Sequence, residues 1–125
     1  MSQSNSTVLI VDDDKIHLEV VGTMLESMGY SVLTASDGFL AISTFEAHAN
    51  AIGCILLDVQ MPGMNGIEVL RHLRENGEDV PVIIVSGYLD DKKRDQIDAL
   101  SPLKYYVKPV DYKTLSKTLA ECIDT

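Results

Sequence analysis

Five short apolar runs, each followed by a helical pattern, restrict the fold of this 125-residue chain more than any other feature. The runs are rich in β-branched residues and lie at residues 8–11, 31–35, 54–57, 81–85 and 105–107. Helical patterns follow at residues 15–28, 38–49, 66–76 and 90–100, and from about residue 111. Buried strands that alternate with amphipathic helices predict one α/β domain, with a parallel sheet covered on both faces and right-handed crossovers.

Two of the helical patterns carry specific expectations. The first has apolar residues at four-residue spacing, which predicts one buried stripe made of Ile16, Val20, Met24 and Met28, widened by Val21 and Leu25. The fourth has only Ile97, Ala99 and Leu100 to bury. Because packing rather than propensity holds helices in proteins, residues 90–100 are expected to form either the least stable element or an ordinary solvated helix.

The charge balance restricts the kinds of partner. The chain has 19 acidic and 10 basic residues, which gives a formal net charge of −9. Nucleic acids require a basic protein surface, and anionic membranes attract one, so this balance argues against both as ligands. The acidity favours cations and basic protein patches instead.

Cysteine usage and hydropathy indicate the compartment. Cys54 and Cys122 lie in apolar settings far apart in the sequence, and we expect two reduced core residues rather than a disulfide or zinc ligands. No stretch approaches the ~20 apolar residues of a membrane helix, and no signal segment opens the chain. We therefore expect a cytoplasmic protein without membrane insertion, in which residues 1–125 form a single domain and residues 1–6 are frayed.

Polar residues follow four of the five predicted strands, namely Asp12, Asp13 and Asp14 after the first, Asp58 after the third, Ser86 after the fourth and Lys108 after the fifth. The carboxyl ends of parallel strands share one edge of a sheet, where ligands bind. Each residue alone has an ordinary explanation, since Asp58 could begin a solvated turn and Asp14 could cap the first helix. Together they predict a functional site at that edge.

The residue types at this edge point to one chemistry. Converging carboxylates repel one another unless a cation lies among them, and Mg²⁺ takes carboxylate, water and phosphate oxygens. Lys108 offers a positive charge to a phosphoryl group, and Ser86 offers a hydroxyl. A carboxylate nucleophile, Mg²⁺, a lysine and a hydroxyl are the groups needed to form and hold an aspartyl phosphate.

The three histidines show no site pattern. His17, His48 and His72 each lie singly on a predicted helix, and none pairs at the spacing of metal ligands. We expect them at the surface or at its boundary with the core.

The chain resembles the receiver domains of two-component response regulators over essentially its whole length, and is similar in size to single-domain chemotaxis regulators. The motifs that carry the resemblance are Val8–Asp13, Leu57–Gly66, Val82–Gly87 and Tyr106–Pro109. The resemblance implies a doubly wound, flavodoxin-like (βα)5 sandwich, with five parallel strands in the order 2-1-3-4-5 and helices on both faces.

The resemblance also implies roles for the residues at the strand ends. Asp58 corresponds to the phosphoacceptor, and Lys108 corresponds to the family's lysine. Asp12 and Asp13 correspond to the acidic pair that holds Mg²⁺, for which Mn²⁺ can substitute, and Asp13 is the more direct ligand. Asp58 itself and the backbone carbonyl of Gln60 complete the protein's share of the metal shell.

Further residues correspond to the switch. Ser86 matches the hydroxyl that turns toward the phosphoryl group, and Tyr105 matches the switch aromatic. Adjacent strand residues face opposite sides, so only one of Tyr105 and Tyr106 can serve the switch face. The Lys108–Pro109 bond is a candidate cis peptide.

Some positions depart from the commonest family pattern. Ser86 and Gly87 stand where threonine and alanine are frequent, and they keep the hydroxyl and the close backbone approach. Gly87 is expected to loosen the loop that follows. Gln60 and Tyr88 occupy positions that tune hydrolysis in this family, and the bulky Tyr88 is expected to screen the phosphoryl group from water.

The function implied by the resemblance is a phosphorylation-dependent signalling switch that catalyses only its own phosphorylation and dephosphorylation. A sensor histidine kinase or histidine phosphotransfer protein would donate the phosphoryl group to Asp58, and the surface of the fifth strand and the last two helices would change. The chain ends with the fifth helix, so no DNA-binding output domain is expected. Output would pass through a protein target, through phosphoryl relay, or through a domain outside this sequence.

Three alternatives stay open. A docking-only receiver would work without phosphorylation. An aspartyl-phosphate hydrolase of the dehalogenase type would need a second acid where Gln60 stands. A flavodoxin-like electron carrier would need a phosphate loop rich in hydroxyls and glycine where Asp12–Asp14 stand, and these acids would repel a phosphate.

Overall fold

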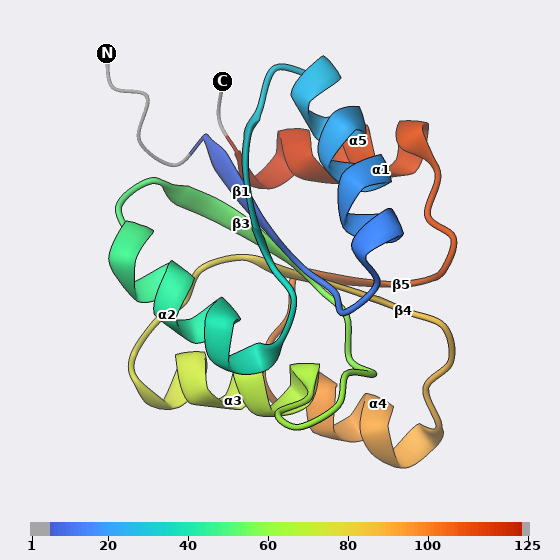
Figure 1. Ribbon diagram of the computed structural model, residues 1–125. Coiled ribbons are helices and arrows are strands. Elements are labelled where there is room, and N and C mark those ends of the chain that lie inside the picture. Colours follow the sequence, from blue (N-terminus) through green and yellow to red (C-terminus); the bar gives the residue numbers. More distant parts are fainter. Residues whose placement is uncertain (1–5, 124–125) are drawn as a thin grey trace.

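The computed structural model describes residues 6–123, so residues 1–5 of the segment predicted to fray lie outside it. Within this range five strands alternate with five helices (Figure 1). The strands are β1 (Thr7–Val11), β2 (Ser31–Ala35), β3 (Ile52–Leu57), β4 (Val82–Ser86) and β5 (Lys104–Val107). The helices are α1 (Lys15–Ser27), α2 (Gly38–His48), α3 (Gly66–Glu75), α4 (Asp91–Asp98) and α5 (Tyr112–Cys122). No helix in this range is both long and apolar enough to cross a bilayer.

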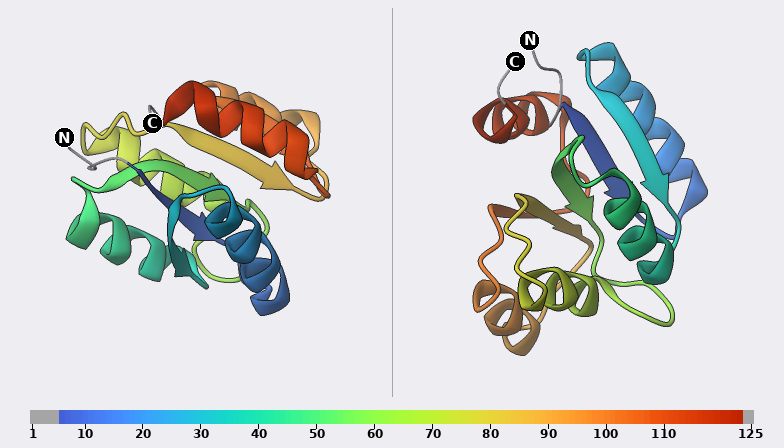
Figure 2. Two further views of the ribbon diagram at one scale, coloured as in Figure 1. Left: turned by 90° about the horizontal axis from the view of Figure 1, so that it is seen from above. Right: turned by 90° about the vertical axis from the view of Figure 1, so that its left-hand side faces the viewer.

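The sheet has the predicted topology. All strand pairs are parallel and the order is β2-β1-β3-β4-β5. Helices α1 and α5 cover one face, and α2, α3 and α4 cover the other (Figures 1 and 2). From β1 the chain goes first to β2 on one side of β1 and then to β3 on the opposite side of β1. The direction in which strands are added to the sheet therefore reverses between β1 and β3. Such a reversal opens a crevice at the carboxyl ends of the strands.

Two hydrophobic cores hold the helices to the sheet. Alternate residues of β1 serve the two faces, with Val8 and Ile10 in the α1–α5 core and Leu9 and Val11 in the core under α2, α3 and α4. This period-two alternation within an entirely apolar run is what a strand buried on both faces requires. The cysteines also behave as predicted, since both thiols are free and both belong to or pack against the α1–α5 core.

The predicted stripe of α1 was wrong at two positions. Ile16 is 74% exposed and Val20 is 55% exposed, whereas Leu18, Val21, Gly22 and Leu25 are the buried residues of the helix. A four-residue step advances slightly more than one helical turn, so a stripe at that spacing winds away from the sheet. Met24 and Met28, at the far end of the stripe, do pack against the core.

Each helix begins at a side chain that accepts a hydrogen bond from its first turn, namely Asp14, Asp37, Asn65, Asp90 or Asp111. Asp14 confirms the capping prediction for α1. Capping side chains satisfy backbone N–H groups that have no partner within the helix. Part of the acidic surplus therefore serves the helices rather than a ligand.

Helix α4 has the weak apolar face that its sequence predicts. Ile97 is its single buried residue, Leu100 packs partly against the core, and Ala99 is exposed. The end of α4 is held by Arg74 of α3, whose guanidinium donates to the backbone oxygens of Leu100 (2.9 Å) and Ser101 (3.1 Å). Polar contacts thus anchor the carboxyl end of α4 where apolar packing is sparse.

Gly66 gives a test of how closely α3 approaches the functional edge. A Cβ at this position would lie 2.2 Å from the backbone oxygen of Asp58 and 2.8 Å from the Cα of Val59. Backbone atoms cannot swing aside, so we expect Gly66→Ala to cost about 1–3 kcal/mol of unfolding free energy. Urea denaturation would measure the loss.

The matched control is Gly22→Ala inside α1. Its Cβ would meet no atom closer than 3.7 Å, and alanine favours a helix interior over glycine by up to about 1 kcal/mol. Equal stability changes in the two variants would contradict the close approach at Gly66.

Candidate functional site

Backbone hydrogen bonds between neighbouring strands fix the residues at the carboxyl edge of the sheet. The N–H of Asp12 donates to the oxygen of Ala35 (3.1 Å), and the N–H of Asp58 donates to that of Val11 (3.0 Å). The N–H of Lys108 donates to the oxygen of Ser86 (2.7 Å). The side chains that follow the strands therefore stand on ordered backbone rather than on free loops.

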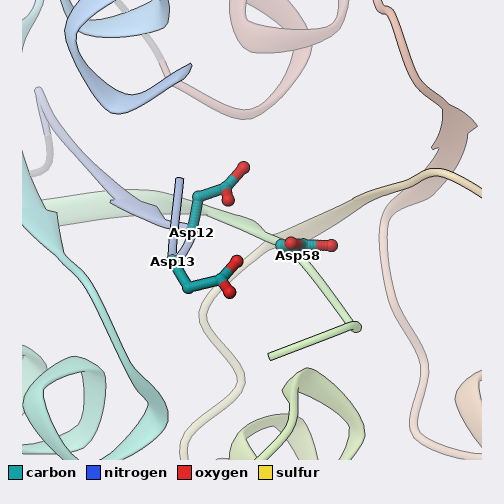
Figure 3. A group of neighbouring side chains, drawn as sticks. All are labelled: Asp12, Asp13 and Asp58. Carbon is teal, nitrogen blue, oxygen red and sulfur yellow. The ribbon is translucent and has the colours of Figure 1, made fainter. Parts of the chain in front are cut away.

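The acids come together as the sequence predicts. Asp12, Asp13 and Asp58 each offer an oxygen, and these oxygens lie within 4.8 Å of one another (Figure 3). Asp12 is 2% exposed and Asp58 is 5% exposed, while Asp13 faces solvent. A purely carboxylate set of oxygens is the donor set that a hard divalent cation prefers, so these residues fit Mg²⁺.

Lys108 supplies the compensating charge on the protein. Its Nζ lies 2.9 Å from Oδ2 of Asp12 and 3.4 Å from Oδ2 of Asp58. Burial disfavours the ammonium ion, but the hydrogen bond to Asp12 and the charge of Asp58 outweigh burial and raise the pKa of Lys108. The lysine is therefore charged at neutral pH and sits closer to Asp12 than to Asp58.

Asp12 and Asp58, the two buried carboxylates, differ in how far nearby charges and hydrogen bonds stabilise their ionised form. Burial raises the pKa of Asp58 and the neighbouring charge of Asp12 adds to the rise, which the charge of Lys108 only partly offsets. For Asp12 burial also acts upward, but hydrogen bonds from Lys108 and from the N–H of Asp14 prevail and lower its pKa. Asp58 is thus the less stabilised of the two buried carboxylates.

Ser86 ends β4 at the same edge of the sheet and presents an unused hydroxyl. The residue is buried, and its Oγ has no hydrogen-bond partner among residues 6–123. A buried polar group without a partner is costly and calls for an explanation. A ligand oxygen bound at this edge of the sheet would provide an acceptor for it.

Gln60 joins the two loops that flank Asp58. Its backbone N–H donates to Oδ1 of Asp58 (3.2 Å), and its Nε2 donates to the backbone oxygen of Tyr88 (3.1 Å). A Cβ on Gly87 would stand 3.5 Å from Oε1 of Gln60, an ordinary contact. The ring of Tyr88 is exposed.

The two adjacent tyrosines of β5 face opposite sides, as predicted. Tyr105 packs against the core under α2, α3 and α4, and the guanidinium of Arg94 lies 5.0 Å from its ring centroid. Tyr106 packs against the α1–α5 core, where its hydroxyl hydrogen-bonds with Oγ1 of Thr118. The Lys108–Pro109 peptide is cis, which confirms that prediction.

Sequence reasoning missed one neighbour of the site. His17 has the expected boundary position on α1, yet its Nδ1 lies 2.6 Å from Oδ2 of Asp12. The residue follows the α1 cap Asp14 by three positions. A polar side chain in the first turn after an acidic strand end was the signal available in the sequence.

The comparisons agree with this geometry. Residues 8–120 match the family model described as the response regulator receiver domain, and the chain belongs to this family. Response regulator protein TodT of Pseudomonas putida is 34% identical over 109 residues, which are 87% of this chain and 47% of TodT. The chain spans about half the length, or less, of the curated relatives it matches. It is a receiver domain and not a member of a classical enzyme family.

Solved structures of similar proteins share the fold. The chemotaxis protein CheY4 of Vibrio cholerae has a TM-score of 0.85 at 29% identity, covering 96% of this chain and 100% of that chain. A chain of the CheX–CheY–BeF3–Mg²⁺ complex from Borrelia burgdorferi has a TM-score of 0.84 at 27% identity, covering 92% of this chain and 87% of that chain. The trio Asp12, Asp13 and Asp58 is typical of the Mg²⁺ sites of receivers.

The raised pKa of Asp58 has a consequence for stability. Asp58→Asn removes a buried, poorly compensated charge, so without divalent ions we expect it to stabilise the protein at pH 7.5 by about 1 kcal/mol. An acid whose pKa is raised on folding opposes folding increasingly as the pH climbs from its unfolded value, near 4, through its folded value. The gain should therefore be smaller at pH 4.5 than at pH 7.5.

Thermal unfolding in the presence of a chelator would measure this gain at both pH values. Asp95→Asn, at an exposed position on α4, is the control and should leave stability nearly unchanged. A destabilised Asp58→Asn protein, or a gain that is larger at the acidic pH, would contradict the proposed charge balance.

Proposed function

We propose that this receiver is a phosphorylation-dependent switch and that Asp58 accepts the phosphoryl group from a histidine kinase or a histidine phosphotransfer protein. The observation that carries the proposal is the setting of Asp58, a buried and under-compensated carboxylate 3.4 Å from the Lys108 ammonium, at the sheet edge where the Ser86 hydroxyl lacks a partner among residues 6–123. Docking without phosphorylation would need none of these features. The unfavourable charge of the site therefore favours the switch over the docking-only alternative.

The chain's own residues account for the transfer. A carboxylate oxygen of Asp58 attacks phosphorus, the bond from phosphorus to the donor nitrogen breaks, and the imidazole leaves with the electron pair. Lys108 lies close enough to follow the charge that develops on the phosphoryl oxygens. Asp12, Asp13, Asp58 and the backbone carbonyl of Gln60 would hold Mg²⁺, which neutralises phosphoryl charge when bound.

The signal would leave the site through Ser86 and Tyr105. The Ser86 hydroxyl would turn to the phosphoryl group, and Tyr105 would change its packing against the core under α4. Arg94 of α4 stacks on Tyr105, so that helix would follow the aromatic ring. Gly87 and Pro109 shape the two loops through which the change passes. This is a population shift toward a state with an altered β5, α4 and α5 surface.

The proposal also covers the domain organisation, the compartment and the output partner of the protein. Residues 1–125 form a single cytoplasmic receiver domain, and its output reaches a protein target or a further phosphotransfer protein. A net charge of −9 fits basic protein patches better than nucleic acid.

Phosphorylation with a small-molecule donor tests the proposal directly. After incubation with acetyl phosphate and Mg²⁺, we expect the intact mass of the wild-type protein to rise by one phosphoryl group. The gain should vanish with a chelator or with Asp58→Asn, and it should persist in the Asp95→Asn control. An unchanged wild-type mass in Mg²⁺ would contradict a working phosphoacceptor and favour docking alone.

Tyr88 gives a separate prediction about the lifetime of the phosphoryl group. Gln60 donates a hydrogen bond to the backbone oxygen of Tyr88, and the ring of Tyr88 is exposed. From this position we expect the ring to shield an aspartyl phosphate from water. Tyr88→Ala should therefore lose the phosphoryl group several-fold faster than wild type in a mass-based decay assay. Leu103→Ala, an exposed apolar truncation near the start of β5, should decay as wild type does. Equal decay in all three proteins would remove this role for Tyr88.

A further inference from the structure

One oxygen of Asp12 has two nitrogen neighbours from other elements. Oδ2 lies 2.6 Å from Nδ1 of His17 and 2.9 Å from Nζ of Lys108. The other oxygen, Oδ1, accepts from the backbone N–H of Asp14 at 2.9 Å. Asp12 is thus held at both oxygens, and Oδ2 is the atom at which its partners can exchange.

The two nitrogens are not equivalent. Lys108 makes a well-formed hydrogen bond to Oδ2. The buried Nδ1 of His17, despite its short distance, has no aligned hydrogen bond among the described residues. A carboxylate only accepts, so an attractive contact at this distance requires the hydrogen on Nδ1. The histidine is therefore close to Oδ2 without the alignment that Lys108 has.

Phosphorylation changes this arrangement. A phosphoryl group adds a charge of about −1.5 to −2 and draws the Lys108 ammonium toward Asp58, which is already 3.4 Å away. Oδ2 of Asp12 would then lose its aligned hydrogen-bond donor while remaining buried, also when the acidic trio holds Mg²⁺. A buried acceptor that loses its donor is costly, which would oppose the movement of the lysine.

We propose that His17 is a positioning residue that takes over Oδ2 of Asp12 when Lys108 turns to the phosphoryl group on Asp58. This inference rests on the proposed function. Nδ1 already lies 2.6 Å from Oδ2, so the exchange needs only a small rotation of the ring. His17 thereby lowers the cost of forming the phosphorylated state without touching the phosphoryl group.

The surroundings of His17 fit this role. Asp14 accepts hydrogen bonds from the N–H groups of Ile16 (3.0 Å) and His17 (3.3 Å), so the backbone that carries the ring is fixed relative to Asp12. The ring borders a cavity of about 10 Å³ that is also lined by Asp12, Asp58 and Val21. The ring is therefore not close-packed on the side that faces this cavity.

The test separates binding of Mg²⁺ from binding of a phosphoryl mimic. Wild type and variants would be titrated by ¹H–¹⁵N NMR, first with Mg²⁺ alone and then with beryllofluoride at saturating Mg²⁺. The variants are His17→Leu, which removes the donor, and His17→Asn, whose amide nitrogen can replace Nδ1. His48→Leu is the matched control, because His48 is an exposed histidine on α2.

The expected result is selective for the mimic. Beryllofluoride affinity should fall about tenfold in His17→Leu, as expected for the loss of one hydrogen bond to a charged group, and the Mg²⁺ affinity should change by less than about twofold. His17→Asn should recover most of the loss, and His48→Leu should behave as wild type. In wild type, the Nδ1–H signal of His17 should become protected from exchange when beryllofluoride binds.

Two kinds of failure are distinguishable. A wild-type protein that binds no beryllofluoride in Mg²⁺ would overturn the proposed function and this inference with it. Tight binding by wild type and equally tight binding by His17→Leu would overturn only the role of His17. Equal losses of Mg²⁺ and beryllofluoride affinity, or an Asn variant as weak as the Leu variant, would show a merely structural contribution and would also overturn it.

Discussion

The common direction and register of the parallel strands is the constraint on which the rest of this molecule depends. Because β1, β3, β4 and β5 run the same way, their last residues meet at one edge, and interstrand hydrogen bonds fix Asp12, Asp58 and Lys108 there. A slip of one residue in any of these strands would send its terminal side chain to the other face. The apolar alternation that anchors each strand between two cores is therefore also what assembles the acidic site.

That assembly concentrates like charge in a place with little solvent. Lys108 offsets the charge of Asp12 more fully than that of Asp58, and the buried Ser86 hydroxyl adds a polar group without a partner. A well-satisfied network would be more stable but would have less to gain from a phosphoryl group. The under-compensated charge of Asp58 and the unpartnered Ser86 hydroxyl are therefore also the features on which the proposed phosphorylation switch rests.

Strands and helix caps, which depend on a few neighbouring residues, could be predicted from the sequence. Side-chain exposure and contacts that depend on how helices are placed against the sheet could not. The β-branched runs and the aspartate at the start of α1 act within a few residues, so the strands and the cap at Asp14 could be predicted. The exposure of Ile16 and Val20 depends on how α1 is rotated against the sheet. The contact of His17 with Asp12 depends on that same rotation, and the preference of Lys108 for Asp12 depends on distances of tenths of an ångström.

The Arg74 guanidinium has a mechanical consequence for α4. It fastens Leu100 and Ser101, just after the helix, to α3, whereas the amino end of the helix follows the loop after Ser86. An eight-residue helix is about 12 Å long, so a rod pinned at one end converts a small tilt into its largest displacement at the other. A tilt of α4 about the contacts of Arg74 would therefore move the amino end of the helix, which follows β4 and Ser86, farther than its carboxyl end.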